Sequence, residues 1–403
     1  MHHLRSSLTA IGSSFLIILA SSCSSGGSNG SAANAGATSQ ANAGSSGISE
    51  AGATTTDAGS GGTDVLEEDG PGSCTPPVDI DKPRQKLSAT GCMDSTDITH
   101  FAARVIPYEV NSPLWSDSAD KQRGMVVPEG QTVHVLDCAL EPDACTQGSA
   151  DTGKWIFPVG TVMVKSFSFD DKLVETRLFV HHDEDTWVGY SYQWDEAQTE
   201  ATLVPDERRA VMFDTGTRKV PWNYPSRTDC MKCHNAAGGS TLGPETRQLN
   251  RVVDGENQLD TLADLGLFDV PPSEPYQAAL VTPYPGQLGS PPDDASTEQK
   301  ARSYLHANCS FCHRPDGDFP DLDLRYDTAF ADMHVCNAPP QKGDVGVPSS
   351  TILTPGQPMQ SGVWLRMNAL PMLGRMPQIG TAQIDTAGVQ LVGDWVSGIQ
   401  SCP

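Results

Sequence analysis

Three stretches in the middle of the chain alternate between apolar and polar positions with the period of a β-strand. They cover residues 161–169, 173–180 and 187–194, are rich in β-branched and aromatic residues, and are separated by short acidic turns. This spacing predicts a meander of antiparallel strands. In the third stretch Tyr190, Tyr192 and Trp194 share one face, which we expect to be the core side rather than a docking platform.

Two stretches near the C-terminus have helical periodicity instead. The first runs from Ser296 to Asn308, where Ser296 or Thr297 can cap a helix that ends at Cys309. The second covers residues 385–400 and gathers its valines on one face. Two amphipathic helices that bracket the segment between them predict one small helical domain.

The patterns divide the chain into five segments. Arg5 and an apolar run too short to span a bilayer indicate an export signal. The expected segments are the signal at 1–22, a Ser/Gly/Ala-rich disordered tether at 23–73, a β-rich domain at 74–227, a short segment with a Pro-rich linker at 228–294, and the helical domain at 295–403. The predicted fold class is therefore α+β, with a β-rich antiparallel meander domain, a small segment and an all-α domain.

The pentapeptide Cys-x-x-Cys-His occurs twice, at 230–234 and at 309–313. On one helical turn, two thiols three residues apart can form thioethers to a porphyrin edge while the adjacent imidazole reaches the iron. This motif is typical of covalent c-type haem attachment. We therefore expect two haem c groups, attached through Cys230, Cys233, Cys309 and Cys312 and ligated to iron by His234 and His313.

A zinc knuckle, a thioredoxin-like dithiol and a disulfide beside a histidine are the alternative interpretations. A zinc site does not need a histidine at the same offset after each cysteine pair, and a redox dithiol normally lies at a βαβ turn. With 11 Cys and 10 His in 403 residues, only about 0.007 such motifs are expected by chance. The repeated histidine favours haem.

The residues before Cys23 resemble the lipoprotein box of bacterial proteins, in which the cysteine becomes the acylated N-terminus. Ala20 stands where that family usually has leucine, and Leu19 lies one place further out. The resemblance implies an exported protein that is held at a membrane by lipid on Cys23 and faces the periplasm or the cell surface. A tether with a root-mean-square span of roughly 40 Å supports this anchor, and secretion of a free protein is the alternative.

Six cysteines remain after the motifs and Cys23 are set aside. An even number suits an oxidising compartment, where thiols pair. Proximity along the chain suggests disulfides between Cys74 and Cys92, Cys138 and Cys145, and Cys336 and Cys402, although spacing alone leaves other connectivities open.

The chain is strongly acidic, with 26 Lys and Arg against 50 Asp and Glu and a formal net charge of −24. This charge argues against a nucleic-acid partner and favours a basic or neutral protein partner, although a merely solvated surface would have the same composition.

Residues 295–403 resemble a class I cytochrome c domain: a helix, the second motif, a loop with Pro320, then Met376-Pro377 and a final helix. The resemblance implies that Met376 is the second axial ligand, with Met372 as a nearby competitor. Sulfur opposite imidazole stabilises ferrous iron and raises the potential.

The same family uses a proline carbonyl to hold the other ring nitrogen of the ligating histidine. The resemblance implies that the Pro320 carbonyl does this for His313. By analogy, Pro244 would do so for His234.

The sequence does not identify the ligand opposite His234, because no Met-Pro element follows the first motif before the second begins. The candidates are His306, Met212, His181, His182, and an empty or water-filled position. Two protein ligands on each iron would make an electron conduit, whereas an open position would permit chemistry on peroxide or another small molecule.

From Tyr108 to the C-terminus the chain resembles a family of bacterial di-haem c-type cytochromes with a β-rich front half. The matching stretches are VNSPLWSD (110–117), FPVGTV (157–162), YPSRTDC (224–230) and YLHANC (304–309). The resemblance implies electron transfer between redox protein partners, such as a dehydrogenase or another cytochrome, more than catalysis. The alternative is a di-haem enzyme of the peroxidase type with an open first haem.

Overall fold

The computed structural model describes residues 73–145, 151–272, 279–283, 294–370 and 374–403, which all belong to one compact unit. The predicted export signal, Cys23 and all but the last residue of the tether lie outside the described residues. So do most of the Pro-rich stretch and Met372.

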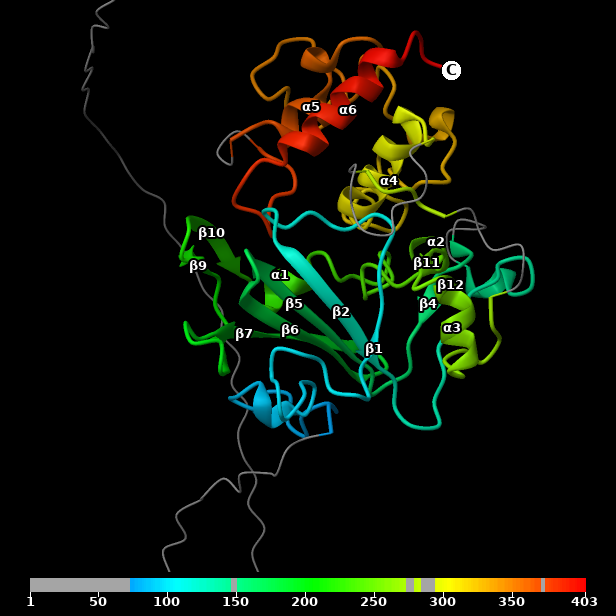
Figure 1. Cartoon of the computed structure of the whole chain (residues 1–403). Coiled ribbons are helices and arrows are strands. Elements are labelled where there is room, and N and C mark those ends of the chain that lie inside the picture. The colour runs from blue at the N-terminus through cyan, green and yellow to red at the C-terminus, as the bar shows by residue number, and fades with distance from the viewer. Residues whose placement is uncertain (1–72, 146–150, 273–278, 284–293, 371–373) are drawn as a thin grey trace, which may run out of the picture. The chain divides into compact units, whose positions relative to one another are not determined.

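An antiparallel six-stranded sheet forms the β-rich part, with the strand order β1-β2-β5-β6-β7-β8 (Figure 1). Its strands are β1 (Ile106–Pro107), β2 (Asp120–Val126), β5 (Val162–Phe169), β6 (Lys172–Asp183), β7 (Thr186–Trp194) and β8 (Ala201–Leu203). The meander predicted from the sequence is confirmed, because β5, β6 and β7 pair with their neighbours in chain order.

One face of this sheet packs against the first described residues of the chain. Tyr190, Tyr192 and Trp194 are 2%, 1% and 3% exposed and lie in one apolar cluster with the buried cysteines Cys74 and Cys92. The expectation that the three aromatic residues face the core is confirmed, because alternation along β7 directs all three to this face.

The other face of the sheet is covered by two groups of residues. The hairpin of β9 (Arg209–Asp214) and β10 (Lys219–Tyr224) packs on Phe167 and Phe169. Helices α2 (Thr246–Leu249) and α3 (Gln258–Asp264) pack beside Met163 and Phe179. The short elements nearby are β3 (His134–Val135), β4 (Trp155–Ile156), α1 (Arg227–Met231), β11 (Val252–Val253) and β12 (Glu256–Asn257).

The segment after residue 228 shares its core with the β-rich part. Single β-bridges join Val133 to Phe268 and Lys154 to Glu245. Leu249 and Leu259 are fully buried in the same cluster as Trp155 and Met163. The first motif is therefore held by the body that contains the sheet.

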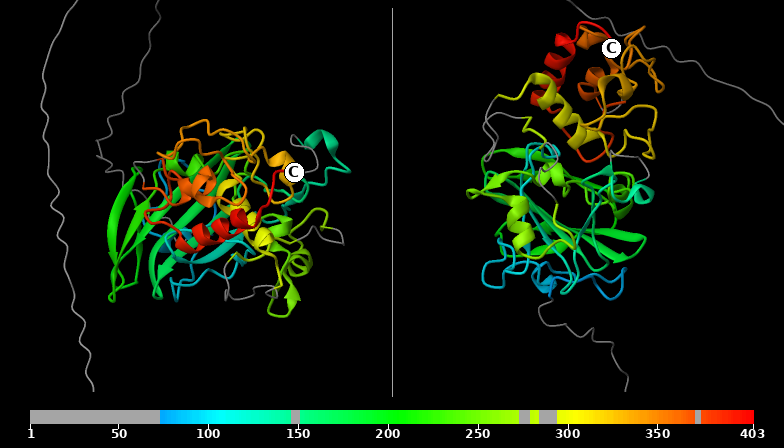
Figure 2. Two further views of the ribbon diagram at one scale, coloured as in Figure 1. Left: turned by 90° about the horizontal axis from the view of Figure 1, so that it is seen from above. Right: turned by 90° about the vertical axis from the view of Figure 1, so that its right-hand side faces the viewer.

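Helices α4 (Thr297–Cys309), α5 (Gly362–Met367) and α6 (Thr386–Gly398) enclose a second apolar core. Figures 1 and 2 show α4 and α6 side by side. Ser296 caps α4 as predicted, in a reciprocal pair of hydrogen bonds with Gln299. The connections also contain single β-bridges from Cys336 to Leu353 and from Thr351 to Ser361.

The mixed α+β fold is thus confirmed, and so are the three disulfides. Cys74 pairs with Cys92, Cys138 with Cys145, and Cys336 with Cys402. The last bridge ties the end of the chain to the loop before α5, across 66 residues. None of the helices in the described ranges is long and apolar enough to cross a membrane.

Candidate haem-binding sites

The first motif begins on helix α1, whose start is fixed by a capping box. The Ser226 side chain accepts from the Asp229 amide, and the Asp229 side chain accepts from the Ser226 amide. Arg208 binds Asp229 in a bidentate pair, and the Lys232 ammonium donates to the same carboxylate at 3.0 Å. The turn that presents Cys230 is therefore anchored before the motif starts.

The motif itself is one tight turn against the sheet. The His234 amide donates to the Cys230 carbonyl at 2.9 Å, and the Cys233 amide donates to the same carbonyl at 3.1 Å. Gly189 on β7 makes room for this turn, because a Cβ there would lie 2.7 Å from the Cys230 sulfur. The two thiols and the imidazole therefore share one turn, as the spacing predicts.

The His234 imidazole is neutral and its orientation is fixed. Burial lowers its pKa to about 3, so the ring is uncharged at physiological pH. Its Nδ1 lies 2.6 Å from the Ser240 carbonyl, which fixes the proton on Nδ1 and leaves the Nε2 lone pair available. The Phe179 ring packs 4.2 Å from the imidazole, between ring centres.

The prediction that Pro244 holds His234 is wrong. The turn through Gly239 and Ser240, both with positive φ, brings the Ser240 carbonyl back to the imidazole. The sequence marks this turn only by its adjacent glycines, so the acceptor could not be chosen from spacing.

The second motif begins at the last residue of α4. The His313 amide donates to the Cys309 carbonyl at 3.0 Å, and the His313 carbonyl accepts from Leu324 at 2.9 Å. Burial lowers the pKa of His313, and the Phe319 backbone opposes that shift. Nδ1 of His313 is buried and has no partner within hydrogen-bond geometry among the described residues.

Pro320 is therefore not the acceptor for His313, and that prediction is also wrong. The neighbouring carbonyl that acts on the imidazole belongs to Phe319, whose ring lies 5.4 Å from it between centres. The sequence pointed to a residue adjacent to Phe319. It could not show which carbonyl is directed at the imidazole, because that depends on the conformation of the local turn.

An apolar cavity of about 130 Å³ connects His313 to the predicted axial methionine. Cys309, His313 and Met376 all line it, with Leu305, Leu324 and Trp395 among the other lining residues. Met376 is held there by its own backbone, because its amide donates to the Arg366 carbonyl at 3.0 Å. The cavity has an imidazole, a thioether and largely apolar walls, with Asp321, Lys342 and Arg366 among its polar lining, which are the donor types and surroundings that a haem requires.

A larger cavity of about 410 Å³ lies beside the first motif. Cys230, Cys233 and His234 line it, and so do residues of the sheet and of the helical part. Three methionines also line this cavity, namely Met163, Met367 and Met376. Met163 and Met367 are potential sulfur ligands that the sequence did not single out, because neither lies in a motif.

The two motifs touch each other. Asn235 donates to the Phe311 carbonyl at 3.1 Å, and Arg314 donates to the Ala237 carbonyl at 2.6 Å. The Cys312 sulfur lies 3.7 Å from the Lys232 carbonyl oxygen. The chain thus returns to the same place although the two motifs begin 79 residues apart.

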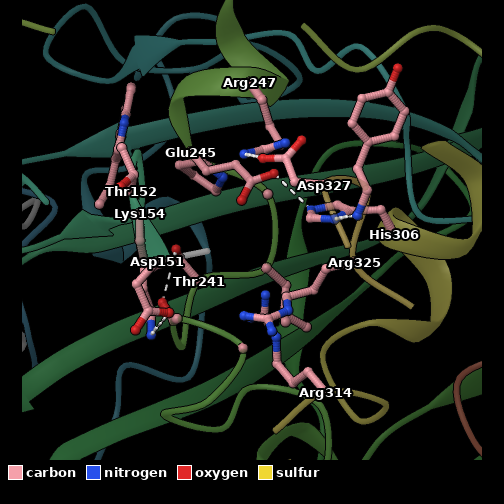
Figure 3. Close-up of a pocket in the computed structure, with 17 residues that line it drawn as sticks. Asp151, Thr152, Lys154, Thr241, Glu245, Arg247, His306, Arg314, Arg325 and Asp327 are labelled. Atoms are coloured by element: carbon pink, nitrogen blue, oxygen red, sulfur yellow. Dashed lines mark hydrogen bonds and ion pairs between the residues drawn. The ribbon is translucent and has the colours of Figure 1, made fainter. Parts of the chain in front are cut away.

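His306 belongs to a polar cluster in which its ring points to Glu245 (Figure 3). Its Nε2 lies 2.8 Å from a Glu245 carboxylate oxygen, and its Nδ1 accepts from the Tyr326 amide at 3.0 Å. The same cluster contains Arg247, whose guanidinium pairs with Asp327. His306 as the ligand opposite His234 is therefore not supported, because both of its ring nitrogens have partners.

The other candidate ligands are also placed elsewhere. Met212 is 60% exposed on β9 and is not part of the lining of the 410 Å³ cavity. His182 binds the Tyr190 hydroxyl at 2.8 Å. His181 is buried and stacks on Trp187 at 4.3 Å between ring centres, outside the lining of that cavity.

The four motif cysteines are not suited to thiolate chemistry. Burial raises the thiol pKa to about 11 for Cys230 and Cys312 and to about 12 for Cys233 and Cys309. A redox dithiol needs a lowered thiol pKa instead. Where the structure describes the chain, no three His, Cys, Asp or Glu side chains gather closely enough to hold a metal ion, so the motifs share no tetrahedral zinc site.

Comparison with known proteins adds no relative. No family description, no curated protein and no solved structure matches the chain.

The ion pair that anchors the first motif predicts a pH-dependent stability. We expect Asp229→Asn to lower the free energy of unfolding by about 1–2 kcal/mol, because an amide keeps the cap but loses the charge that Arg208 and Lys232 bind. Arg208 holds the pKa of this carboxyl below its ordinary 3.8. The contribution is therefore full above pH 3.8 and is lost as the pH falls through the folded-state pKa.

Urea denaturation at pH 7 and at pH 3 measures this effect, and the difference between variant and wild type should be smaller at pH 3. Asp214→Asn is the matched control, because Asp214 is exposed and its ion pair with Lys219 is 3.9 Å long. Equal losses in the two variants would contradict the assignment.

Proposed function

We propose that this protein is an electron carrier with two haem c groups, one attached to each Cys-x-x-Cys-His motif. The observation that carries the proposal is the direct contact between the motifs, which are joined by Asn235 and Arg314. Cofactors attached to touching turns would lie close enough for rapid electron exchange. Iron in such a group exchanges single electrons at a potential that the protein sets through ligands, hydrogen bonds and burial.

The cysteine pattern supports covalent attachment. Disulfides use all six of the other cysteines in the described residues, and Cys230, Cys233, Cys309 and Cys312 stay free. Free paired thiols beside disulfides, in a chain with an export signal, call for another partner. Thioether bonds to a porphyrin would supply that partner, with His234 and His313 as iron ligands.

For residues 295–403 we propose a class I cytochrome c fold. Helices α4 and α6 bracket the second motif and pack on each other, as the resemblance implies. His313 and Met376 line one apolar cavity. Met376 is accordingly the proposed second axial ligand, and a sulfur ligand there would raise the potential of the second site.

The first site allows a second candidate function. Neither His306 nor Met212 is placed to ligate opposite His234, and the adjoining cavity has a volume of about 410 Å³. Ligation by Met163 or Met367 opposite His234 would fill the sixth position and make the protein an electron carrier. A vacant position would instead give an enzyme of the peroxidase type, with the second site supplying electrons.

We also propose that the protein is exported, is anchored to a membrane by lipid on Cys23, and exchanges electrons with protein partners such as a dehydrogenase or another cytochrome. The signal, the cysteine and the tether support this arrangement. A net charge of −24 favours basic or neutral partners and opposes nucleic acid.

Haem attachment is tested by mass spectrometry of protein produced with cytochrome maturation machinery. The wild type is expected to gain about 1.2 kDa. Cys230→Ala/Cys233→Ala and Cys309→Ala/Cys312→Ala should each lose half of this mass and half of the haemochrome absorbance. Cys138→Ala/Cys145→Ala, which removes only a disulfide, should keep both. Colourless protein of unmodified mass would refute the proposed function.

Replacing Met376 tests the ligand of the second site. Met376→Ala should convert one low-spin centre into a form that binds carbon monoxide and should lower its potential by on the order of 0.2 V. Met359→Ala is the control, because Met359 is an exposed methionine of the same part of the chain. An unchanged spectrum in Met376→Ala would remove Met376 as the ligand.

Electron paramagnetic resonance of the same wild-type preparation separates the two candidate functions. Two low-spin ferric centres that bind neither carbon monoxide nor peroxide would support the carrier. A high-spin first centre with peroxide turnover would favour the enzyme.

The anchor is tested with Cys23→Ala. This variant should stay in the precursor form and should lose the acyl group that the mature wild type carries, because only the cysteine accepts lipid. Mass spectrometry of the N-terminal peptide distinguishes the acylated mature form from the unprocessed precursor, and Ser25→Ala is the control. Identical processing and membrane association in Cys23→Ala would contradict lipidation.

A further inference from the structure

Three cations form a row across the face of the sheet that borders the first motif. Arg123 on β2 stands directly opposite Lys165 on β5, and Lys165 stands directly opposite Arg177 on β6. All three side chains line the 410 Å³ cavity beside Cys230 and His234. The row therefore belongs to the wall of the first site.

Such a row is unfavourable by itself, because like charges on directly opposed strand positions repel each other. Arg177 is compensated by the buried Glu175, which it binds through two hydrogen bonds of 2.8 Å. Arg123 has a weaker partner. Its guanidinium nitrogen lies 3.9 Å from a carboxylate oxygen of Glu109, and the Glu109 side chain is 51% exposed to solvent. The row thus carries more positive charge than its own carboxylates neutralise.

Lys165 is the least compensated member. Among the residues that the structure describes, its ammonium forms neither a hydrogen bond nor an ion pair, and it lies 5.4 Å from the centre of the Phe167 ring. Burial and the neighbouring Arg123 charge lower the pKa of Lys165 well below its ordinary value. The charged form of Lys165 therefore has no paired carboxylate among the described residues.

The other cations of the cavity do have local partners. Arg208 pairs with Asp229, and Arg375 donates to the Thr381 carbonyl. Among the described residues no carboxylate forms an ion pair with Lys165, although Glu175 acts on it at longer range. Of the cations that line the cavity, Arg177 and Arg208 have close carboxylate partners, whereas Lys165 has none in that part of the chain.

We propose that Arg123 and Lys165 form a carboxylate-binding site for the two propionates of the haem attached through Cys230 and Cys233. This inference rests on the proposed function. A haem carries two propionates as well as the groups that form thioethers, and Arg123 and Lys165 line the same cavity as Cys230, Cys233 and His234.

The site predicts a specific effect on the potential. A cation that pairs with a propionate reduces the negative charge felt at the iron and so disfavours the ferric state. Lys165→Met removes that charge without breaking any ion pair of the protein, so the fold should be kept. We expect a lower midpoint potential at the first haem, little change at the second, and a shifted propionate bending band in resonance Raman spectra.

The measurement uses the full chain with both haems attached, and haem content is determined in each sample. Lys165→Gln is the second variant, which retains a polar side chain and should give a change in the same direction. Lys219→Met is the control, because Lys219 is an exposed cation on β10 outside the cavity lining. Unchanged potential and propionate band in both Lys165 variants, with two haems present, would overturn the inference alone.

Two other results are also decisive. A wild-type protein without covalent haem refutes the proposed function and the propionate site together. Titration of the holoprotein with succinate and with inorganic phosphate tests a free anion as the occupant. A saturable shift of the first potential that Lys165→Met abolishes would show that the row binds a free anion, and would overturn the propionate assignment. No response to either anion is the expected result.

Discussion

The seam between the two Cys-x-x-Cys-His turns determines the layout of the surrounding structure. The first turn lies between β7, where Gly189 leaves room for the Cys230 sulfur, and the second turn, which Asn235 and Arg314 hold in place. Both the sheet and the helices therefore contribute walls to this seam. The two parts belong to a single compact unit.

Charge is distributed unevenly between the outside and the inside of the molecule. The chain has an excess of carboxylates overall, but buried cations border the first cavity. Other interior charges of the described residues form pairs, for example His306 with Glu245 and Arg247 with Asp327. Burial of an unpaired charge is costly, which is the reason for proposing an anionic ligand at Lys165.

Local patterns in the sequence were sufficient for much of the fold. Alternation predicted β5, β6 and β7, helical spacing and caps predicted α4 and α6, and proximity along the chain predicted the three disulfides. These features depend on neighbours in sequence. The Ser-x-x-Asp capping box before Cys230 is a local signal of the same kind that could also have been found.

The features that the sequence did not predict depend on distant contacts. The Ser240 carbonyl reaches His234 through a turn, and Glu245 reaches His306 from 61 residues away. The register that aligns Arg123 with Lys165 is set by two strands that are 35 or more residues apart in the chain. Spacing and composition carry no information about contacts between residues that are distant in the chain. The partners of His234, His306 and Lys165 could therefore be identified only in the structure.

The two imidazoles differ in one respect that bears on how the whole molecule would work. His234 has a strong acceptor on its Nδ1, whereas His313 has no full hydrogen bond there among the described residues. An imidazole that shares its proton with a carbonyl is a more electron-rich donor and favours an oxidised metal. Iron at His313, facing the Met376 sulfur, would be the more easily reduced of the two. With haem attached at both motifs, as proposed, this difference would favour electron flow from the site beside the sheet to the site among the helices.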